Sequence, residues 1–507
     1  MYPPAHPSAV RSLTHHLSVV AATLLCLGST LFAESRHPAV QAAKLDPALK
    51  GRLLLEELNC VACHAAPTGA DLKSKQAPRL SDVAQRIHPT YLEKFISAPH
   101  TTKPGTTMPD LLAQLPAAER ATAAKELTHF LLSLKASTFT PQAPDAVAAT
   151  QGEKLFHARG CAACHSPRDA QGRETLPATS VPLGALEEKY SFRSLVEFLR
   201  QPHLSRPSGR MPDLKLPSRE LECIAHYLLR DTRVPGHLNY TMYRGQVWEG
   251  IGHEAVEPER AGQTADFALS NLDRIHHHMA LRFEGWINLK ADGDYQFFLK
   301  ANGATLTING KEVAAFAPKD RRGVQAFEGK ATLRAGMQQI RLDYYHTGRE
   351  PSLSFEVAGP NFPRQAIASA LLSVSEKAIP AFSRPTVDTQ LATQGRQKFS
   401  QLGCVSCHND VGVPASAPAV ALTMADVTRG CLDAQSLKGA RFDLSAEQVS
   451  WIHAALKQGL ATALTPEQTL HTELTRFNCI ACHDRRGLGG IAPERNALFT
   501  STTPALG

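Results

Sequence analysis

One five-residue pattern, Cys-x-x-Cys-His, occurs four times in this 507-residue chain and constrains its fold more than any other feature. The copies read CVACH at 60–64, CAACH at 161–165, CVSCH at 404–408 and CIACH at 479–483. They contain eight of the 11 cysteines, whereas a secreted disulfide protein scatters its cysteines and a cytosolic protein seldom clusters them. The chain is therefore expected to fold as several small units, each built around one copy.

The chemistry that this spacing serves is covalent attachment of haem. Each cysteine can form a thioether with one haem vinyl group, and the histidine that follows can bind the iron. A thioredoxin-type thiol pair and half of a zinc site are the alternatives. Four copies, each preceded by an amphipathic helix, favour haem c at four covalent sites. The predicted attachment residues are Cys60, Cys63, Cys161, Cys164, Cys404, Cys407, Cys479 and Cys482, and the predicted proximal iron ligands are His64, His165, His408 and His483.

The sixth iron ligand is predicted separately for each copy. Met108 and Met211 occupy matched positions after the first and second motifs, and both precede Pro-Asp in a loop ahead of the last helix. A thioether ligand raises the reduction potential of a haem and closes its iron to other ligands. We therefore expect Met108 and Met211 to be the distal ligands of the first and second haems.

The third and fourth copies lack this methionine. In the third, the aligned position is about Gly439, so His453 is the candidate replacement, with Met424 and His471 less favoured; an open third iron is the other possibility. No methionine follows the fourth motif. Either the sequence is truncated there, which is the favoured interpretation, or another domain covers the fourth haem.

Four helical regions and one β region are predicted along the chain. Residues 45–135 and 148–232 are two copies of one helical domain, 390–460 are a shortened third copy, and 465–507 begin a fourth. An offset of 103 residues aligns the first two copies without a gap, and it pairs Leu92, Phe95, Pro99, His100, Pro104, Met108, Pro109, Asp110 and Leu111 with Leu195, Phe198, Pro202, His203, Pro207, Met211, Pro212, Asp213 and Leu214.

The β region spans residues 237–360. Its segments alternate apolar and polar residues, as in DYQFFLKANGATLTINGKEV at 294–313, and turn signals separate them. Asn309–Gly310 predicts a type I′ hairpin. Several short strands of this kind indicate an all-β sandwich or barrel. The predicted fold class is therefore multidomain, with all-α haem domains flanking an all-β sandwich.

The first 33 residues have the form of a signal peptide, with an apolar stretch at 18–33 that is shorter than a membrane span. An uncleaved anchor is the alternative. No later segment is apolar enough to cross a membrane, so the protein is expected to be periplasmic or otherwise exported. The net charge of +7 includes no run of like charges, which gives little reason to expect nucleic acid as a partner.

Two further features invite functional interpretations. Cys223 and Cys431 lie outside the motifs. Cys223 is on an apolar helix face and is expected to be a buried thiol, and a disulfide between the two cysteines is the alternative. The histidines at 276–278 could bind a metal, but consecutive residues on a strand point to opposite faces, which disfavours a shared site.

At the motifs and methionines quoted above, the sequence resembles repeated class I cytochrome c domains. The stretches MALRFEGWINLKADGDYQFFLKANGATLTINGKEV (279–313) and AGMQQIRLDYYHTGREPSLSFEV (335–357) resemble the domain named after anthrax protective antigen. Together they are similar to bacterial periplasmic multihaem cytochromes that carry such a sandwich. The resemblance implies electron transfer by the haems and carbohydrate or surface binding by the sandwich. Sugar-binding members hold calcium with an Asp pair, and this chain has Ala301–Asn302 at that place.

Three functions are weighed from these features. The favoured one is an electron carrier that passes single electrons between unidentified redox-partner proteins. A haem enzyme of peroxidase type, with its open site at the third haem, is the second. A haem protein that binds a polysaccharide or a cell surface through the sandwich is the third.

Overall fold

The computed structural model describes residues 38–169, 173–176, 180–245, 247, 251, 256–272, 275, 278–316, 323–346, 350–360, 362–377, 379, 382, 384, 386–414, 420–422, 430–433 and 439–499. The predicted signal peptide, Met424 and the first two histidines of the 276–278 run lie outside these residues. Among the described residues, no helix is long and apolar enough to cross a membrane.

The described chain before residue 230 and after residue 388 is mainly helical. Its helices are α2 (Pro38–Ala42), α3 (Pro47–Glu57), α4 (Val83–Arg86), α5 (Pro89–Ser97), α6 (Pro99–Thr102), α7 (Ala117–Ser133), α8 (Ala146–Ala158), α9 (Leu186–Lys189), α10 (Phe192–Arg200), α11 (Pro202–Ser205), α12 (Ser218–Leu228), α13 (Thr389–Gln401), α14 (Ala446–Gln458), α15 (Pro466–Arg476) and α16 (Pro493–Asn496). It also contains the two-residue strands β1 (His64–Ala65), β13 (Val420–Ala421), β14 (Asp484–Arg485) and β15 (Leu488–Gly489). Short 3₁₀ turns lie at η1 (Cys60–Ala62), η2 (Cys161–Ala163), η5 (Leu269–Asn271), η6 (Ser369–Leu371), η7 (Cys404–Ser406), η8 (Gly430–Leu432) and η9 (Cys479–Ala481).

The predicted repeat is visible in the helices. The elements α4, α5 and α6 return as α9, α10 and α11 with every boundary shifted by the same 103 residues. The helix that leads into each of the first three motifs also begins alike, because Asp46, Asp145 and Asp388 cap α3, α8 and α13 by accepting hydrogen bonds from first-turn N–H groups. The fourth leading helix, α15, begins instead with a capping box between Thr465 and Gln468.

Residues 238–373 form two antiparallel sheets. Their strands are β2 (Leu238–Gly245), β3 (Val256–Thr264), β4 (Met279–Leu289), β5 (Gly293–Ala301), β6 (Ala304–Ile308), β7 (Lys311–Phe316), β8 (Gln325–Leu333), β9 (Gly336–His346), β10 (Leu353–Gly359), β11 (Phe362–Ala366) and β12 (Leu372–Ser373). One sheet has the order β11-β10-β5-β8, and the other β3-β2-β4-β9-β6-β7 with β12 beside β4. Inward residues of both sheets, such as Phe297 and Phe283, share one buried core, so the region is a sandwich.

The predicted tight hairpin is confirmed. Asn309 and Gly310 connect the paired strands β6 and β7, and both have positive φ, 50° and 77°, as a type I′ turn requires. Asn302 has a structural role nearby: its buried amide accepts hydrogen bonds from the Tyr344 hydroxyl and the Ser352 N–H, each at 2.7 Å, and donates one to the Glu350 carbonyl at 3.1 Å. Its amide oxygen is thus engaged inside the sandwich.

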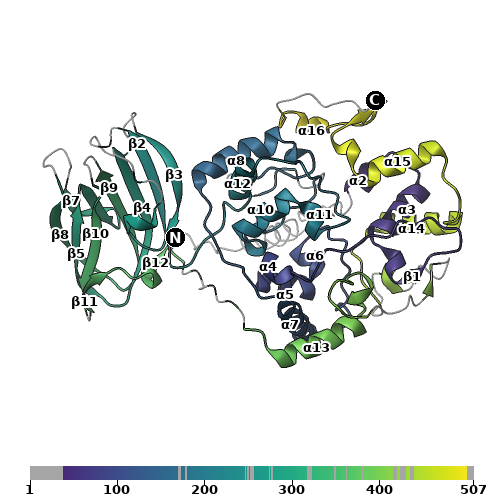
Figure 1. Ribbon diagram of the computed structural model, residues 1–507, viewed down its shortest axis with the longest axis horizontal. Coiled ribbons are helices and arrows are strands. Elements are labelled where there is room, and N and C mark those ends of the chain that lie inside the picture. The colour runs from purple at the N-terminus through teal and green to yellow at the C-terminus, as the bar shows by residue number, and fades with distance from the viewer. Residues whose placement is uncertain are drawn as a thin grey trace, which may run out of the picture.

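The arrangement of the parts in space differs from the flanking order along the sequence. Figure 1 shows the sandwich at one end of the molecule, while the helices that precede and follow it in sequence lie together at the other end. The sandwich docks on the second helical region through β3, where Gln263 bonds to the Val234 N–H at 2.9 Å and to the Thr232 carbonyl at 3.1 Å. The sandwich therefore does not separate the helical domains in space.

Candidate haem-attachment sites

All four motifs adopt the same local conformation. The residue before the first cysteine has left-handed backbone, with φ of 53° at Asn59, 79° at Gly160, 78° at Gly403 and 58° at Asn478. Glycine and asparagine tolerate this conformation at the end of a helix, and the motif then turns as one 3₁₀ loop. In each copy the N–H of the second cysteine donates to the carbonyl of the first at 3.2 Å. One tight turn thus holds both cysteines beside the histidine.

Four cysteines of these turns have raised thiol pKa values. Burial raises the pKa of Cys60 and Cys404 to about 12, and that of Cys161 and Cys164 to about 11. A redox-active Cys-x-x-Cys pair needs a lowered thiol pKa, so the thioredoxin-type alternative fits poorly. In the described part of the chain, no group of three or more Cys, His, Asp or Glu side chains is arranged to hold a metal ion by itself.

Two of the predicted proximal histidines are oriented so that Nε2 is available to a metal. The Nδ1 atom of His165 lies 2.9 Å from the Val181 carbonyl oxygen, and Nδ1 of His408 lies 2.9 Å from the Pro78 carbonyl oxygen. A ring that donates Nδ1–H to a carbonyl keeps Nε2 unprotonated for a metal. Burial lowers the pKa of His165 to about 4 and also lowers that of His408, so both rings are neutral at physiological pH. This pattern fits covalently attached haem.

In the second helical region, α8 is the leading helix, which precedes the motif, and α12 is the closing helix, which ends the region. These two helices pack on each other. Gly152 on α8 allows close approach, because a Cβ there would lie 1.9 Å from the Cys223 carbonyl oxygen of α12. Phe156 faces Tyr227, with ring centroids 5.4 Å apart. The Asp145 N–H donates to Nδ1 of His226 at 3.0 Å. The same glycine contact recurs in two other pairs of a leading and a closing helix.

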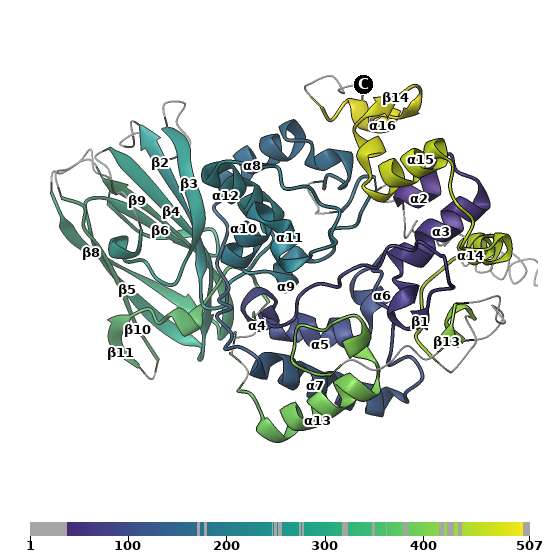
Figure 2. The same ribbon diagram turned by 45° about the vertical axis from the view of Figure 1, so that its right-hand side comes forward.

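The first and third regions exchange their closing helices. Helix α13, which leads into the third motif, packs on α7 of the first region, and α3, which leads into the first motif, packs on α14 of the third (Figures 1 and 2). A Cβ at Gly395 would lie 2.0 Å from the Glu126 carbonyl oxygen, and one at Gly51 would lie 1.8 Å from that of Trp451. The contiguous regions predicted at 45–135 and 390–460 are thus not separate packing units. The hydrophobic pattern specifies a helix face, and either closing helix can cover it.

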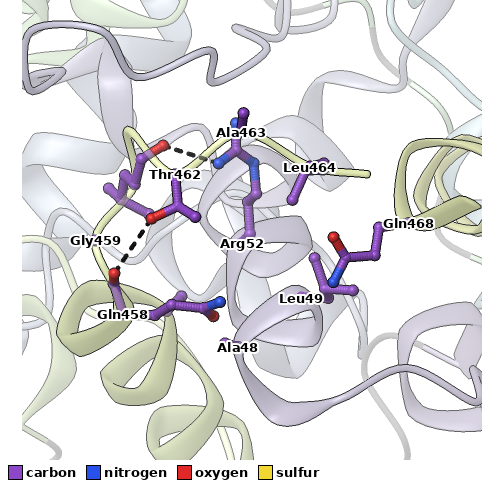
Figure 3. Close-up of a pocket in the computed structure, with 11 residues that line it drawn as sticks. Ala48, Leu49, Arg52, Gln458, Gly459, Thr462, Ala463, Leu464 and Gln468 are labelled. Carbon is purple, nitrogen blue, oxygen red and sulfur yellow. Dashed lines mark hydrogen bonds between the residues drawn. The ribbon is translucent and has the colours of Figure 1, made fainter. Parts of the chain in front are cut away.

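Figure 3 shows the α3–α14 contact from a shallow pocket beside it. Arg52 reaches from α3 to the Leu460 carbonyl oxygen at 2.9 Å, just after the end of α14. The lining also includes Thr462 and Gln468, and no motif residue. The pocket therefore belongs to the helix contact and lies apart from the attachment turns.

The predicted distal ligands lie in loops of the same kind. Met108 follows α6 and Met211 follows α11, and both side chains are half-buried. A histidine at the matched position holds each loop: Nε2 of His100 lies 3.1 Å from the Met108 carbonyl oxygen, and Nε2 of His203 lies 3.1 Å from that of Gly209. Each methionine therefore precedes a closing helix in a fixed loop.

Two of the alternative ligands predicted for a third haem lie on helices that contact α3, which leads into the first motif. His453 is exposed on α14, and His471 lies on α15. Gly439 faces Cys431, whose Sγ would lie 3.5 Å from a Cβ at the glycine. Both Cys223 and Cys431 are free thiols, so the alternative of a disulfide between them is wrong.

The four attachment turns form two adjacent pairs, a feature that the sequence analysis missed. Asn59 Nδ2 lies 3.9 Å from Cys407 Sγ, and Asn478 Nδ2 lies 3.5 Å from Cys164 Sγ. Each contact joins a motif preceded by asparagine to a motif preceded by glycine. That difference between NCxxCH and GCxxCH was the signal available in the sequence.

Buried charged side chains link the two pairs of turns to each other and hold the fourth motif against the second. Glu57 of α3 is 2% exposed at its side chain and bonds to Lys75 at 2.7 Å and to Arg210, next to Met211, at 2.6 Å. Beside it, Glu56 pairs with Arg476 of α15. Arg495 of α16, which is also buried, donates to the Ala162 carbonyl at 2.6 Å. The fourth motif is thus held against both the first and the second regions.

One family model matches the chain, cytochrome c, over residues 149–230. Those residues therefore form a cytochrome c domain in a multidomain chain of helices and antiparallel sheets, and such a domain implies covalently bound haem c and haem-based electron transfer. No curated protein matches the chain.

Solved structures resemble parts of it. They include an anti-sigma factor domain-containing protein from Clostridium clariflavum (20% identity, 27% of this chain and 48% of that one, TM-score 0.23), the PA14 domain of MpAFP antifreeze protein (16%, 29% and 94%, 0.25) and a PA14 sugar-binding domain from an RTX adhesin (19%, 28% and 99%, 0.23). The chain spans about half the length of the anti-sigma factor domain-containing proteins that it matches.

Proposed function

We propose that the chain is an exported electron carrier with four covalently attached c-type haems. The observation that carries this proposal is the pairing of the attachment turns, first with third and second with fourth, through Asn59–Cys407 and Asn478–Cys164. Adjacent attachment points keep neighbouring haems close, and a carrier needs closely spaced groups to pass electrons along the molecule. A bound haem supplies reversible one-electron chemistry at its iron.

The protein's own residues prepare the sites for this role. Burial holds His165 and His408 neutral and the Val181 and Pro78 carbonyls orient their rings, so both present Nε2 without the loss of a proton. Cys60 and Cys404 lie in partly desolvated surroundings, and a less polar surrounding raises the reduction potential of an iron site. No residue here has to make or break a substrate bond, which separates a carrier from a haem enzyme.

The β-sandwich contributes a rigid attachment to the second haem domain. Besides the Gln263 contacts, Arg260 of β3 lies 3.7 Å from Asp145, the cap of α8. Since the amide oxygen of Asn302 is engaged inside the sandwich, calcium-dependent sugar binding at that position is not part of the proposal. The partners of the proposed carrier are redox proteins that dock near the haems.

The test is a haem count with a redox titration of the purified protein. Four haems should stay with the polypeptide after acid–acetone extraction, because thioether bonds survive where coordination bonds do not. Replacing both cysteines of one motif by alanine should remove one haem per chain, and the intact protein should take up four electrons in reversible single-electron steps. A mass without covalent haem would contradict the proposal. Rapid turnover of hydrogen peroxide would replace the carrier with the enzyme.

A further inference from the structure

The exchange of closing helices carries an inference that rests on the proposed function. We propose that the first and third haem sites are composite: Met108, from the first region, is the distal ligand of the haem on Cys404, Cys407 and His408. The haem on Cys60 and Cys63 is covered by the third region through α14 and the residues that pack in the same cluster as Cys60, which include Leu432, Phe442 and Leu444. The haem without an aligned methionine is then the first, and not the third.

The side chains at matched positions fit the exchanged pairing. In the second domain, Phe156 lies one turn after Gly152 on α8 and contacts Tyr227 on α12. In the exchanged pair of α13 and α7 these places hold Phe399 and Phe130, whose ring centroids are also 5.4 Å apart. The other exchanged pair holds Leu55 and Ala455. Contiguous domains would separate the two phenylalanines and set Phe399 against the small Ala455.

Charge complementarity gives the same answer. The carboxylate of Glu126 on α7 is 8% exposed at its side chain and lies 3.4 Å from Nζ of Lys398 on α13. Position 398 corresponds to Leu54 of α3, so contiguous packing would leave this buried carboxylate against leucine. A buried charge without a partner is strongly unfavourable. The Asp388 N–H also donates to Nδ1 of His129 at 3.0 Å, which repeats the Asp145–His226 contact.

The proximal side of the third motif is exchanged too. Pro78, which accepts from His408, lies in the first region at the position where Val181 lies in the second. The carboxylate of Asp410 accepts from the N–H groups of Leu80 at 2.9 Å and Ser81 at 3.0 Å. First-region residues therefore surround the histidine of the third motif.

Met108 belongs to this same packing unit. It lies as far beyond Pro78 as Met211 lies beyond Val181, because both pairs follow the offset of the repeat. The same helices, α5 with α6 and α10 with α11, precede the two loops, and α7 and α12 follow them. Met211 and the second motif lie within one cytochrome c match at residues 149–230, so the matching unit places Met108 with the third motif.

The spectroscopic test compares Met108→Leu in two backgrounds, each lacking one haem. With the third haem removed by Cys404→Ala and Cys407→Ala, Met108→Leu should leave the methionine–ferric charge-transfer band unchanged. With the first haem removed by Cys60→Ala and Cys63→Ala, it should halve that band and lower one reduction potential. Met211→Leu is the matched control and should weaken the band in both backgrounds. The reverse result for Met108 would overturn the ligand assignment.

A second test needs no haem signal and uses the full-length wild-type protein. In monomer isolated by size exclusion, carbodiimide should join Glu126 to Lys398, and peptide mass spectrometry should detect the link. Lys398→Arg is the matched control and should abolish it. Failure to find this link, while the 2.7 Å pair of Lys75 and Glu57 is joined, would overturn the exchange. Absence of covalent haem would instead refute the proposed function, so the two failures can be told apart.

Discussion

Substitution of Phe399 by alanine should weaken a helix that lies about 270 residues earlier in the sequence. Phe399 is 2% exposed on α13, and its ring lies at 64° to that of Phe130 on α7. Loss of a buried phenylalanine side chain costs about 3–5 kcal/mol. If this unit opens locally, hydrogen exchange of the α7 and α13 amides should accelerate by about two to four orders of magnitude.

The pairwise part of this effect can be isolated with a double-mutant cycle. Phe399→Ala, Phe130→Ala and the double variant should give a coupling free energy of about 0.5–1.5 kcal/mol, the usual value for an aromatic pair. The cycle of Phe156 and Tyr227 in the second domain is the matched control, with the same centroid distance. The amides of α3 and α14 should keep their protection in all these variants.

The result that would refute this reasoning is specific. If Phe399→Ala accelerates exchange in α13 and α14 but leaves α7 protected, then α13 packs on the closing helix of its own region. A zero coupling between Phe399 and Phe130, beside a normal coupling in the control cycle, would lead to the same conclusion.

Three further predictions concern the charges and close contacts around the motifs. Glu57→Gln should lower the free energy of unfolding by about 1–3 kcal/mol, as denaturant unfolding can measure. This loss is smaller than that for breaking a fully buried ion pair, because Lys75 and Arg210 keep some contact with water. Glu447→Gln, on the exposed face of α14, is the control and should have little effect. Gly152→Ala should lower the free energy of unfolding by about 1–3 kcal/mol or more, because the added Cβ would overlap the Cys223 carbonyl and push α8 away from α12. Thermal unfolding measures this loss, and an unchanged midpoint would contradict the close contact of α8 and α12. Hydrogen bonds from the Leu391 and Gln390 N–H groups lower the pKa of Asp388. Its stabilisation of α13 should therefore be complete above the ordinary pKa of 3.8 and should be lost as pH falls through the lowered pKa. Hydrogen exchange of the α13 amides should show this loss, and Asp388→Asn should remove the pH dependence.

Much of the local structure could be predicted from the sequence because short-range patterns specify it. The offset between the first two regions anticipated the matching boundaries of α4 to α6 and α9 to α11. Alternation predicted the strands, and Asn309–Gly310 predicted its turn, since both residues tolerate positive φ. The motif spacing indicated haem attachment, and residues 149–230 match the cytochrome c model.

Features that depend on which surfaces meet could not be predicted from the sequence. His453 was a candidate for the third haem only if α14 closes the third region, but α14 packs on α3 and leaves His453 exposed. The contacts of Asn59 with Cys407 and of Asn478 with Cys164 were also unforeseen, because they join motifs hundreds of residues apart. A pattern within one repeat contains no information about the repeat that lies against it.

The sequence by itself therefore determined the attachment turns, the helices around them and the β-sandwich, because periodicity, capping and turn residues act over a few positions. Only the tertiary structure decided which closing helix covers which motif. Loop-closure entropy rises slowly with the length of the connecting chain, so a long connection adds little to the cost of exchange. The choice then depends on side-chain complementarity, and it is the packing of Phe399 on Phe130 and of Lys398 on Glu126 that favours the exchanged pairs.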